Sequence, residues 1–144
     1  MKAAERVVVD TNTIVSGILL PGSVPGRLLG FLAEHSILIF SAATRDELLG
    51  VIAREKFDRY VAAEARERAA TILVREAEIV VPRRLFHVCR DPKDDKFLDA
   101  AYAGKADRLI SGDDDLIALG AVEGIPILTA AQYLARIARQ HPSP

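Results

Sequence analysis

Four acidic residues in separate parts of the chain have side chains that could together bind a hard cation. They are Asp10, Glu47, Asp95 and Asp113, and Asp10 and Asp113 follow short apolar runs typical of buried strands. Ligands of parallel sheets bind beyond the carboxyl ends of the strands, so a ligand is expected near these two acids. Oxygen donors alone suit Mg²⁺ or Mn²⁺. The three histidines are scattered and form no metal-ligand pair, which disfavours zinc.

Capping of helix N-termini is an alternative role for the same acids. Asp10 could cap the helix that follows it, and the spacing Thr44-x-x-Glu47 matches a capping box. One of the three consecutive carboxylates at 113–115 could cap the next helix. All three repel one another unless a cation or a helix N-terminus offsets their charge. The local pattern leaves both roles open for Asp10 and favours the cap for Glu47.

The three aspartates of the segment Asp91-Pro-Lys-Asp-Asp95 differ in the roles that their positions predict. With Asp91 as the N-cap and Pro92 as the first helical residue, Asp94 falls at the third position, so both acids have a capping role. Asp95 has none, and it lies at the edge of the face that Leu98 buries. A carboxylate there is costly unless it is paired or binds a cation. We therefore predict a functional role for Asp95 and a structural role for Asp94.

Short apolar runs alternate with helical patterns along the chain. Uninterrupted apolar runs suit strands buried on both faces, and their alternation with helices favours an α/β sandwich around a parallel sheet. The predicted strands are Val7–Val9, Ile37–Phe40, Glu78–Val81, Leu109–Ile110 and Ile125–Leu128, and the predicted helices cover about 25–32, 44–52, 61–73, 91–104 and 130–138.

Two of these helices carry specific local signals. Ser23 is placed to cap the helix whose first turn contains Pro25. In the helix at 61–73, the apolar spacing puts Ala65 and Ile72 on the buried face and Arg66 on the solvent face. The chain as a whole, 1–144, fits one domain, and the tail at 140–144 is expected to fray.

The composition limits the class of protein. Half of the 144 residues are hydrophobic and the mean hydropathy is +0.16, which excludes an intrinsically disordered chain. The balance of 19 basic and 20 acidic residues excludes a globally basic nucleic-acid binder, although eight of the eleven aspartates lie between Asp91 and Asp115. Cys89 is the only cysteine, so an intramolecular disulfide is excluded. Without an apolar run of about 18 residues or a signal-peptide pattern, we expect a cytoplasmic protein that spans no membrane.

Four motifs occur in the order and approximate spacing of one known family. They are Val7-Val-Val-Asp10-Thr-Asn12, Ser41-x-x-Thr-x-x-Glu47-Leu, Arg90-Asp-Pro-Lys-Asp-Asp95-Lys-Phe-Leu and Leu109-Ile-Ser-Gly-Asp113-x-Asp115-Leu. Through these motifs nearly the whole chain resembles the PIN-domain ribonucleases and, more narrowly, the VapC-like toxins of bacterial and archaeal toxin–antitoxin pairs. The Asp-Pro-Lys-Asp-Asp-Lys stretch departs from the toxin pattern and resembles a less characterised branch.

The resemblance implies a three-layer α/β/α sandwich with a parallel sheet of about five strands, and metal-dependent endonuclease cleavage of RNA. Asp10, Glu47, Asp95 and Asp113 fall on the family's acidic quartet, which would hold Mg²⁺ or Mn²⁺, and this favours a ligand role for Glu47. The resemblance also implies a type II toxin–antitoxin pair, with a small antitoxin that presents Arg to the carboxylates, and homodimers are common in the family. Asp115 matches a further acid, and Thr11, Asn12 and Ser111 match supporting polar positions.

RNA would approach this acidic pocket through cations at its rim. Two other functions stay open: a PIN-like module that binds RNA or protein without cleavage, and another Mg²⁺-dependent α/β phosphohydrolase. The intact quartet argues against the first, and Asn12 stands where aspartyl phosphatases usually carry a second aspartate. The candidates for RNA-backbone contacts are Arg45, Arg83, Arg84, Arg90, Lys93 and Lys96.

Overall fold

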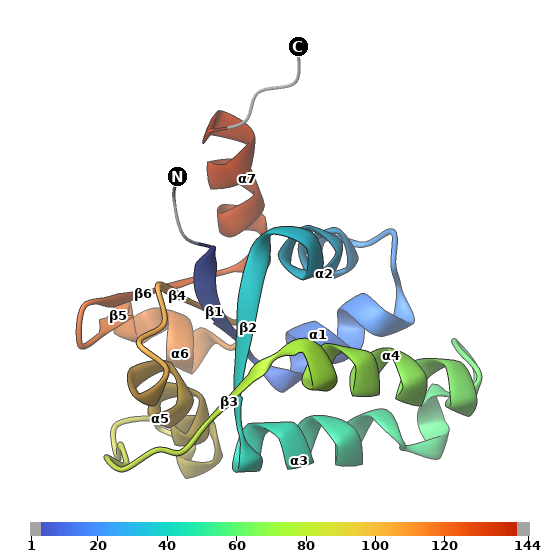
Figure 1. Ribbon diagram of the computed structural model, residues 1–144, viewed down its shortest axis with the longest axis horizontal. Coiled ribbons are helices and arrows are strands. Elements are labelled where there is room, and N and C mark those ends of the chain that lie inside the picture. Colours follow the sequence, from blue (N-terminus) through green and yellow to red (C-terminus); the bar gives the residue numbers. More distant parts are fainter. Residues whose placement is uncertain (1–3, 141–144) are drawn as a thin grey trace.

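The computed structural model describes residues 4–140, which form a six-stranded sheet with helices on both faces (Figure 1). The strand order is β3-β2-β1-β4-β6-β5, and every pair is parallel except β5 with β6. The predicted parallel sheet of about five strands is confirmed, and β5 adds a short antiparallel strand at one edge. The strands are β1 Glu5–Val9, β2 Ser36–Ser41, β3 Glu78–Val80, β4 Arg108–Ile110, β5 Ala121–Val122 and β6 Ile125–Leu128.

Two helical layers cover the sheet, which confirms the predicted three-layer sandwich. In Figure 1, α3 and α4 run side by side, and α7 stands next to α2 at the opposite end of the molecule. Two 3-10 turns, η1 Glu55–Phe57 and η2 Pro92–Asp94, precede α4 and α5. The larger layer contains α1 Thr11–Leu19, α2 Val24–His35, α3 Ala42–Ile52, α4 Ala63–Glu76 and α7 Ala130–Gln140, and the smaller layer contains α5 Asp95–Ala103 and α6 Asp114–Leu119.

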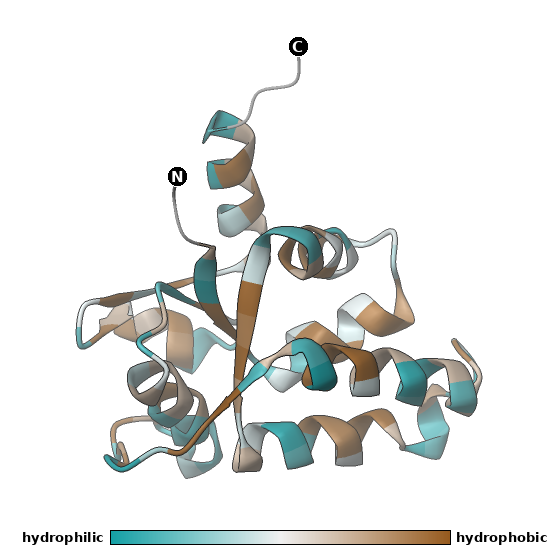
Figure 2. Ribbon diagram, viewed as in Figure 1, coloured by the Kyte–Doolittle hydropathy of each residue, from teal (hydrophilic) through white to brown (hydrophobic). Residues whose placement is uncertain are grey.

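The central strand β1 separates two hydrophobic cores. Val7 and Val9 pack into the core beneath the larger helical layer, and Val8 packs into the core beneath the smaller one. Side chains alternate across a strand, so an apolar run without polar interruption is stable only where both faces are covered. Figure 2 shows the same hydrophobic character along the neighbouring strand β2.

Two helix starts confirm the sequence signals. Ser23 caps α2 by accepting a hydrogen bond from the Gly26 N–H, and Pro25 lies in the first turn of that helix. Asp91 caps η2 by accepting from the Lys93 N–H at 3.0 Å. In both elements the N-cap side chain accepts a hydrogen bond from the first turn and a proline lies in that turn, as the spacing of these residues predicts.

The predicted capping box of Thr44 and Glu47 is wrong. Helix α3 starts at Ala42, and its capping box pairs the side chains of Ser41 and Thr44 with each other's backbone N–H groups. The helix therefore begins one turn earlier than the predicted box requires, which leaves Glu47 in the helix interior with no role at the N-terminus.

Helix α4 is rotated about its axis relative to the prediction. Arg66, predicted on the solvent face, is only 1% exposed, whereas Ala65 and Ile72 face solvent. Apolar spacing misses this arrangement because hydrogen bonds offset the burial of the guanidinium. The Arg66 guanidinium donates to the carbonyl oxygens of Ile52, Ala53, Arg54 and Val61 and to the carboxylate of Asp58.

Within residues 4–140, no single helix is long and apolar enough to span a membrane; α1 and α2 meet the length and composition criterion only together, bent by 100°. Ile14 of α1 and Leu32 of α2 are buried in the core. Of the tail predicted to fray, Gln140 is the last residue of α7, and 141–144 lie outside the described residues.

Gly26→Ala is expected to destabilise the protein by about 2 kcal/mol or more, because overpacking forces the backbone to shift. A Cβ at Gly26 would lie 2.2 Å from the Pro21 carbonyl oxygen and 2.6 Å from that of Leu20. The matched control is Gly30→Ala in the same helix, where a Cβ meets nothing within 4 Å and alanine favours the helix by up to about 1 kcal/mol. Urea unfolding measures both; equal stabilities would contradict the close packing of the turn between α1 and α2.

Candidate functional site

Asp10 lies between β1 and α1 and faces the end of β4. One carboxylate oxygen accepts from the Thr13 N–H at 2.9 Å, so Asp10 caps α1. The other oxygen accepts from the Ser111 hydroxyl and from the Gly112 N–H at 3.2 Å. Because β1 and β4 are neighbouring parallel strands, their carboxyl ends meet at one edge of the sheet. Asp10 thus caps a helix and also lies where ligands of this fold class bind.

Asp113 caps α6, and Ser111 connects it to Asp10. One carboxylate oxygen of Asp113 accepts from the N–H groups of Asp115 and Leu116, at 2.7 and 3.4 Å. The Ser111 hydroxyl donates to Asp10 and accepts from the Asp113 N–H at 2.9 Å. Ser111 is completely buried. One buried hydroxyl therefore fixes the positions of both acids.

Asp95 is buried at the start of α5, with 7% of its surface exposed. One carboxylate oxygen accepts from the N–H groups of Cys89 and Val88, at 2.9 and 3.2 Å. Burial opposes the charge on Asp95, but these hydrogen bonds outweigh it and lower its pKa below the ordinary value. Asp95 therefore stays ionised while it holds the segment that leads into η2.

Asp94 does not have the capping hydrogen bond that the sequence predicts. It precedes α5 in a helical conformation, and its side chain accepts no hydrogen bond from the first turn. Burial and the negative charges of Asp113 and Asp91 together raise the pKa of Asp94 to about 6, against a smaller opposite effect of Lys96. A hydrogen bond with Asp113 also favours the protonated form. The sequence missed this contact because Asp94 and Asp113 meet only in the folded chain.

Asp94→Asn is expected to stabilise the protein by about 1 kcal/mol at about pH 8, after allowance for solvent screening, and to have no effect at about pH 4. The folded-state pKa is about 6 against an ordinary 3.8, so the stability contributed by protonated Asp94 is present below 3.8 and is lost as the pH rises through about 6. Thermal unfolding of both proteins in EDTA at the two pH values measures the difference. A variant less stable than wild type at about pH 8 would contradict the contact with Asp113.

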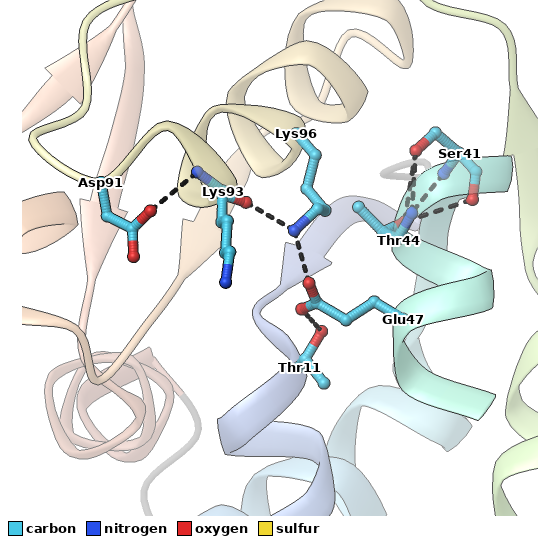
Figure 3. A network of polar contacts seen from close by, with 7 residues as sticks. All are labelled: Thr11, Ser41, Thr44, Glu47, Asp91, Lys93 and Lys96. Atoms are coloured by element: carbon cyan, nitrogen blue, oxygen red, sulfur yellow. Dashed lines mark hydrogen bonds and ion pairs between the residues drawn. The ribbon is translucent and has the colours of Figure 1, made fainter. Parts of the chain in front are cut away.

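Glu47 connects three helices (Figure 3). One carboxylate oxygen accepts from the Thr11 hydroxyl at 2.5 Å, and the other accepts from the ammonium of Lys96. The Lys96 ammonium also donates to the Lys93 carbonyl oxygen at 2.5 Å. In Figure 3 no dashed line joins the Lys93 ammonium to Glu47. Glu47 on α3 is therefore tied to the start of α1 and to α5.

Three of the four predicted acids lie in two hydrogen-bonded groups that are joined through the sequence neighbours Asp10 and Thr11. Asp10, Ser111 and Asp113 form the first, and Thr11 and Glu47 belong to the second. Asp95 belongs to neither group, since its carboxylate accepts from the Cys89 and Val88 N–H groups. Within residues 4–140, no three or more His, Cys, Asp or Glu side chains are close enough together to hold a metal ion. The oxygen donors nevertheless fit Mg²⁺, which binds through one or two carboxylates and keeps several waters.

The remaining predicted residues surround these groups. Asn12 is exposed, and Asp115 contributes its backbone N–H to the cap of α6. Arg45 pairs with its neighbour Asp46 at 3.0 Å. Arg83, Arg90 and Lys93 are exposed, whereas the Arg84 guanidinium lies over the rings of Phe86 and Tyr102 and pairs with Glu123.

A model of the PIN domain family matches residues 6–115, a range that contains all four predicted acids. The chain belongs to the PIN domain family. A curated relative of this PIN domain, the uncharacterised protein MJ1680 of Methanocaldococcus jannaschii, is 34% identical over 116 residues, which cover 79% of this chain and 74% of that protein.

Solved structures with the fold of this PIN domain include VapC proteins. VapBC from Salmonella typhimurium, bound to DNA, has a TM-score of 0.56 at 14% identity and covers 88% of this chain and 98% of that one. VapBC2 from Rickettsia felis, bound to a DNA fragment from their promoter, has a TM-score of 0.55 at 14% sequence identity. The match covers 86% of this chain and 98% of that one. VapC20 from Mycobacterium tuberculosis, a toxin that cleaves the sarcin–ricin loop, has a TM-score of 0.51 at 16% sequence identity. The match covers 83% of this chain and 99% of that one. At these identities the likeness is one of fold.

Proposed function

We propose that this PIN domain is a divalent-metal-dependent endoribonuclease and the toxin of a type II toxin–antitoxin pair. The observation that carries the proposal is the arrangement of Asp10, Ser111 and Asp113 at the carboxyl ends of two neighbouring strands. The fold is shared with VapC20, which cleaves the sarcin–ricin loop, and this supports RNA as the substrate.

In this proposal Asp10 and Asp95 are the direct ligands of Mg²⁺ or Mn²⁺, and Asp113 and Glu47, with Asp115 nearby, complete the site. A bound ion would lower the pKa of a water molecule and would stabilise the charge that develops on the phosphate. Backbone N–H groups and the Ser111 hydroxyl hold Asp10 in place before RNA binds.

Water attacks the phosphorus atom in this reaction, and the bond to the leaving oxygen breaks, so the chain need not supply a nucleophile. Cations at the rim would position the RNA backbone without reading its sequence. Arg90 and Lys93 on the segment before α5, and Arg45 on α3, are the candidates that flank the acids.

Incubation of a defined RNA panel with Mg²⁺, with Mn²⁺ or with EDTA tests the proposal. We expect cleavage with either ion and none in EDTA, because in this proposal the bound ion lowers the pKa of the attacking water and offsets the charge on the phosphate. Binding of RNA without cleavage would favour the non-cleaving module, and hydrolysis of a phosphomonoester but not of RNA would favour another phosphohydrolase.

The partner in this proposal is a small antitoxin that presents Arg to the acidic site. Support comes from the two DNA-bound VapBC structures of the same fold. Co-expression with the product of a short adjacent gene is expected to yield a complex in which RNA cleavage is suppressed. Full cleavage activity in a stable complex would contradict a partner that occupies the acidic site.

A further inference from the structure

Lys96 is the one cationic side chain, among residues 4–140, that forms an ion pair with a carboxylate of the proposed metal site. Its ammonium donates to Glu47 and, at 2.5 Å, to the Lys93 carbonyl oxygen. Both members of the pair are partly shielded from water, since the Lys96 side chain is 21% exposed and that of Glu47 is 30% exposed. Figure 3 shows the ammonium between α5 and α3.

Both carboxylate oxygens of Glu47 already accept hydrogen bonds. The Thr11 hydroxyl donates to one at 2.5 Å, and the Lys96 ammonium donates to the other. A divalent ion on Glu47 would therefore meet a positive charge at the same carboxylate. Partial burial strengthens the repulsion between two cations relative to bulk water, because the effective dielectric constant is lower.

The position of Lys96 does not depend on Glu47 alone. The Lys93 carbonyl oxygen accepts from the same ammonium, and the nitrogen also lies 5.5 Å from the centre of the Phe97 ring. These contacts keep the ammonium beside Glu47, so a metal ion must displace it or share the carboxylate with it.

We propose that Lys96 competes with a divalent cation for Glu47 and thereby sets the metal affinity of the site. This inference rests on the proposed function, because it presupposes that the acidic site binds a divalent ion. By competing for a ligand, Lys96 couples metal binding to the position of α5: the ion binds more tightly whenever the ammonium leaves Glu47.

Calorimetric titration with Mn²⁺ tests the proposal without relying on activity. Lys96→Met keeps the length of the side chain and removes its charge, and we expect about tenfold tighter Mn²⁺ binding, which is within the usual range of coupling between sites. Lys93→Met is the matched control, since it removes an equal charge three residues away that does not contact Glu47; we expect a change below about twofold.

A double-mutant cycle assigns the effect to Glu47. In a Glu47→Gln background the competition is removed, so Lys96→Met is expected to change the Mn²⁺ affinity less than about twofold. Lys96→Gln, which retains a neutral donor, serves as a second variant if Lys96→Met unfolds at a lower temperature. Unchanged or weaker Mn²⁺ binding by folded Lys96 variants would overturn the competition.

The experiment separates this inference from the proposed function. Mn²⁺ binding by wild type that is lost in Asp10→Asn, with no effect of Lys96→Met, would overturn the role of Lys96 and leave the metal site standing. Absence of Mn²⁺ binding by wild type, or binding that Asp10→Asn does not weaken, would overturn both.

Discussion

Asp10→Asn is expected to reduce the rate of RNA cleavage at least about a hundredfold, which is about 2.7 kcal/mol of activation free energy. The charge of Asp10 would be lost from a direct metal ligand, while its other function remains, because Asn caps helices as well as Asp does. The amide oxygen can accept from the Thr13 N–H as the carboxylate does at 2.9 Å. The amide nitrogen would then replace the oxygen that accepts from both Ser111 and Gly112. The Gly112 N–H would lose its acceptor and the Ser111 hydroxyl would have to accept instead of donate, so we expect a stability loss of about 2 kcal/mol.

The matched control for this variant is Asp114→Asn. This variant also removes one negative charge, from the aspartate-rich stretch at 91–115. Asp114 is exposed and lies in the first turn of α6. We expect its cleavage rate to stay within about twofold of wild type. Single-turnover cleavage of one RNA, beside a urea unfolding curve for each variant, separates catalysis from folding. A folded Asp10→Asn protein that cleaves at the wild-type rate would remove Asp10 from the mechanism.

Arg66→Met is expected to cause the largest loss of stability, about 3 kcal/mol or more. The variant removes the donors for carbonyl oxygens at the end of α3 and in the following turn, at 2.7 Å for Ile52 and 3.0 Å for Arg54. These oxygens would be left without their partner near a buried side chain that is only 1% exposed in wild type. Methionine fills much of the volume, so the loss reports chiefly on the hydrogen bonds.

Two controls distinguish this network from a surface ion pair. Asp58→Asn removes the charged partner of Arg66, but the Asp58 side chain is 60% exposed, and we expect a loss below about 1 kcal/mol. Arg68→Met removes an exposed arginine of the same helix and should change stability by less than about 0.5 kcal/mol. Chemical denaturation gives all three values. Equal losses for Arg66→Met and Arg68→Met would show that the carbonyl network contributes little.

Features set by neighbouring residues could be predicted from the sequence. The apolar run at Val7–Val9 has to be a strand covered on both faces, and Ser23 and Asp91 start the elements that their local spacing predicts. Asp10 and Asp113 could be placed at one edge of the sheet because parallel strands present their carboxyl ends together.

Features that depend on contacts between residues far apart in the chain could not be predicted from the sequence. The local pattern favours a cap of its own helix for Glu47, and only the family resemblance favours a ligand role. Its partners are Thr11 and Lys96, which are 36 and 49 residues away. Arg66 reads as a surface residue because its acceptors lie on a turn whose path the helical pattern does not define. The two-residue strand β5 is shorter than any periodic signal can reveal.

The hydrogen bond between Ser111 and Asp10 joins residues that are 101 positions apart, and this has a consequence for the timing of synthesis. Contacts of such separation form late, after the intervening chain has been made and has collapsed. A nascent chain carries Asp10 and Glu47 long before it carries the strand that ends beside Asp10. Under the proposed function, a polypeptide still growing on the ribosome would therefore lack an assembled acidic site, and nuclease activity would begin only once the sheet is complete.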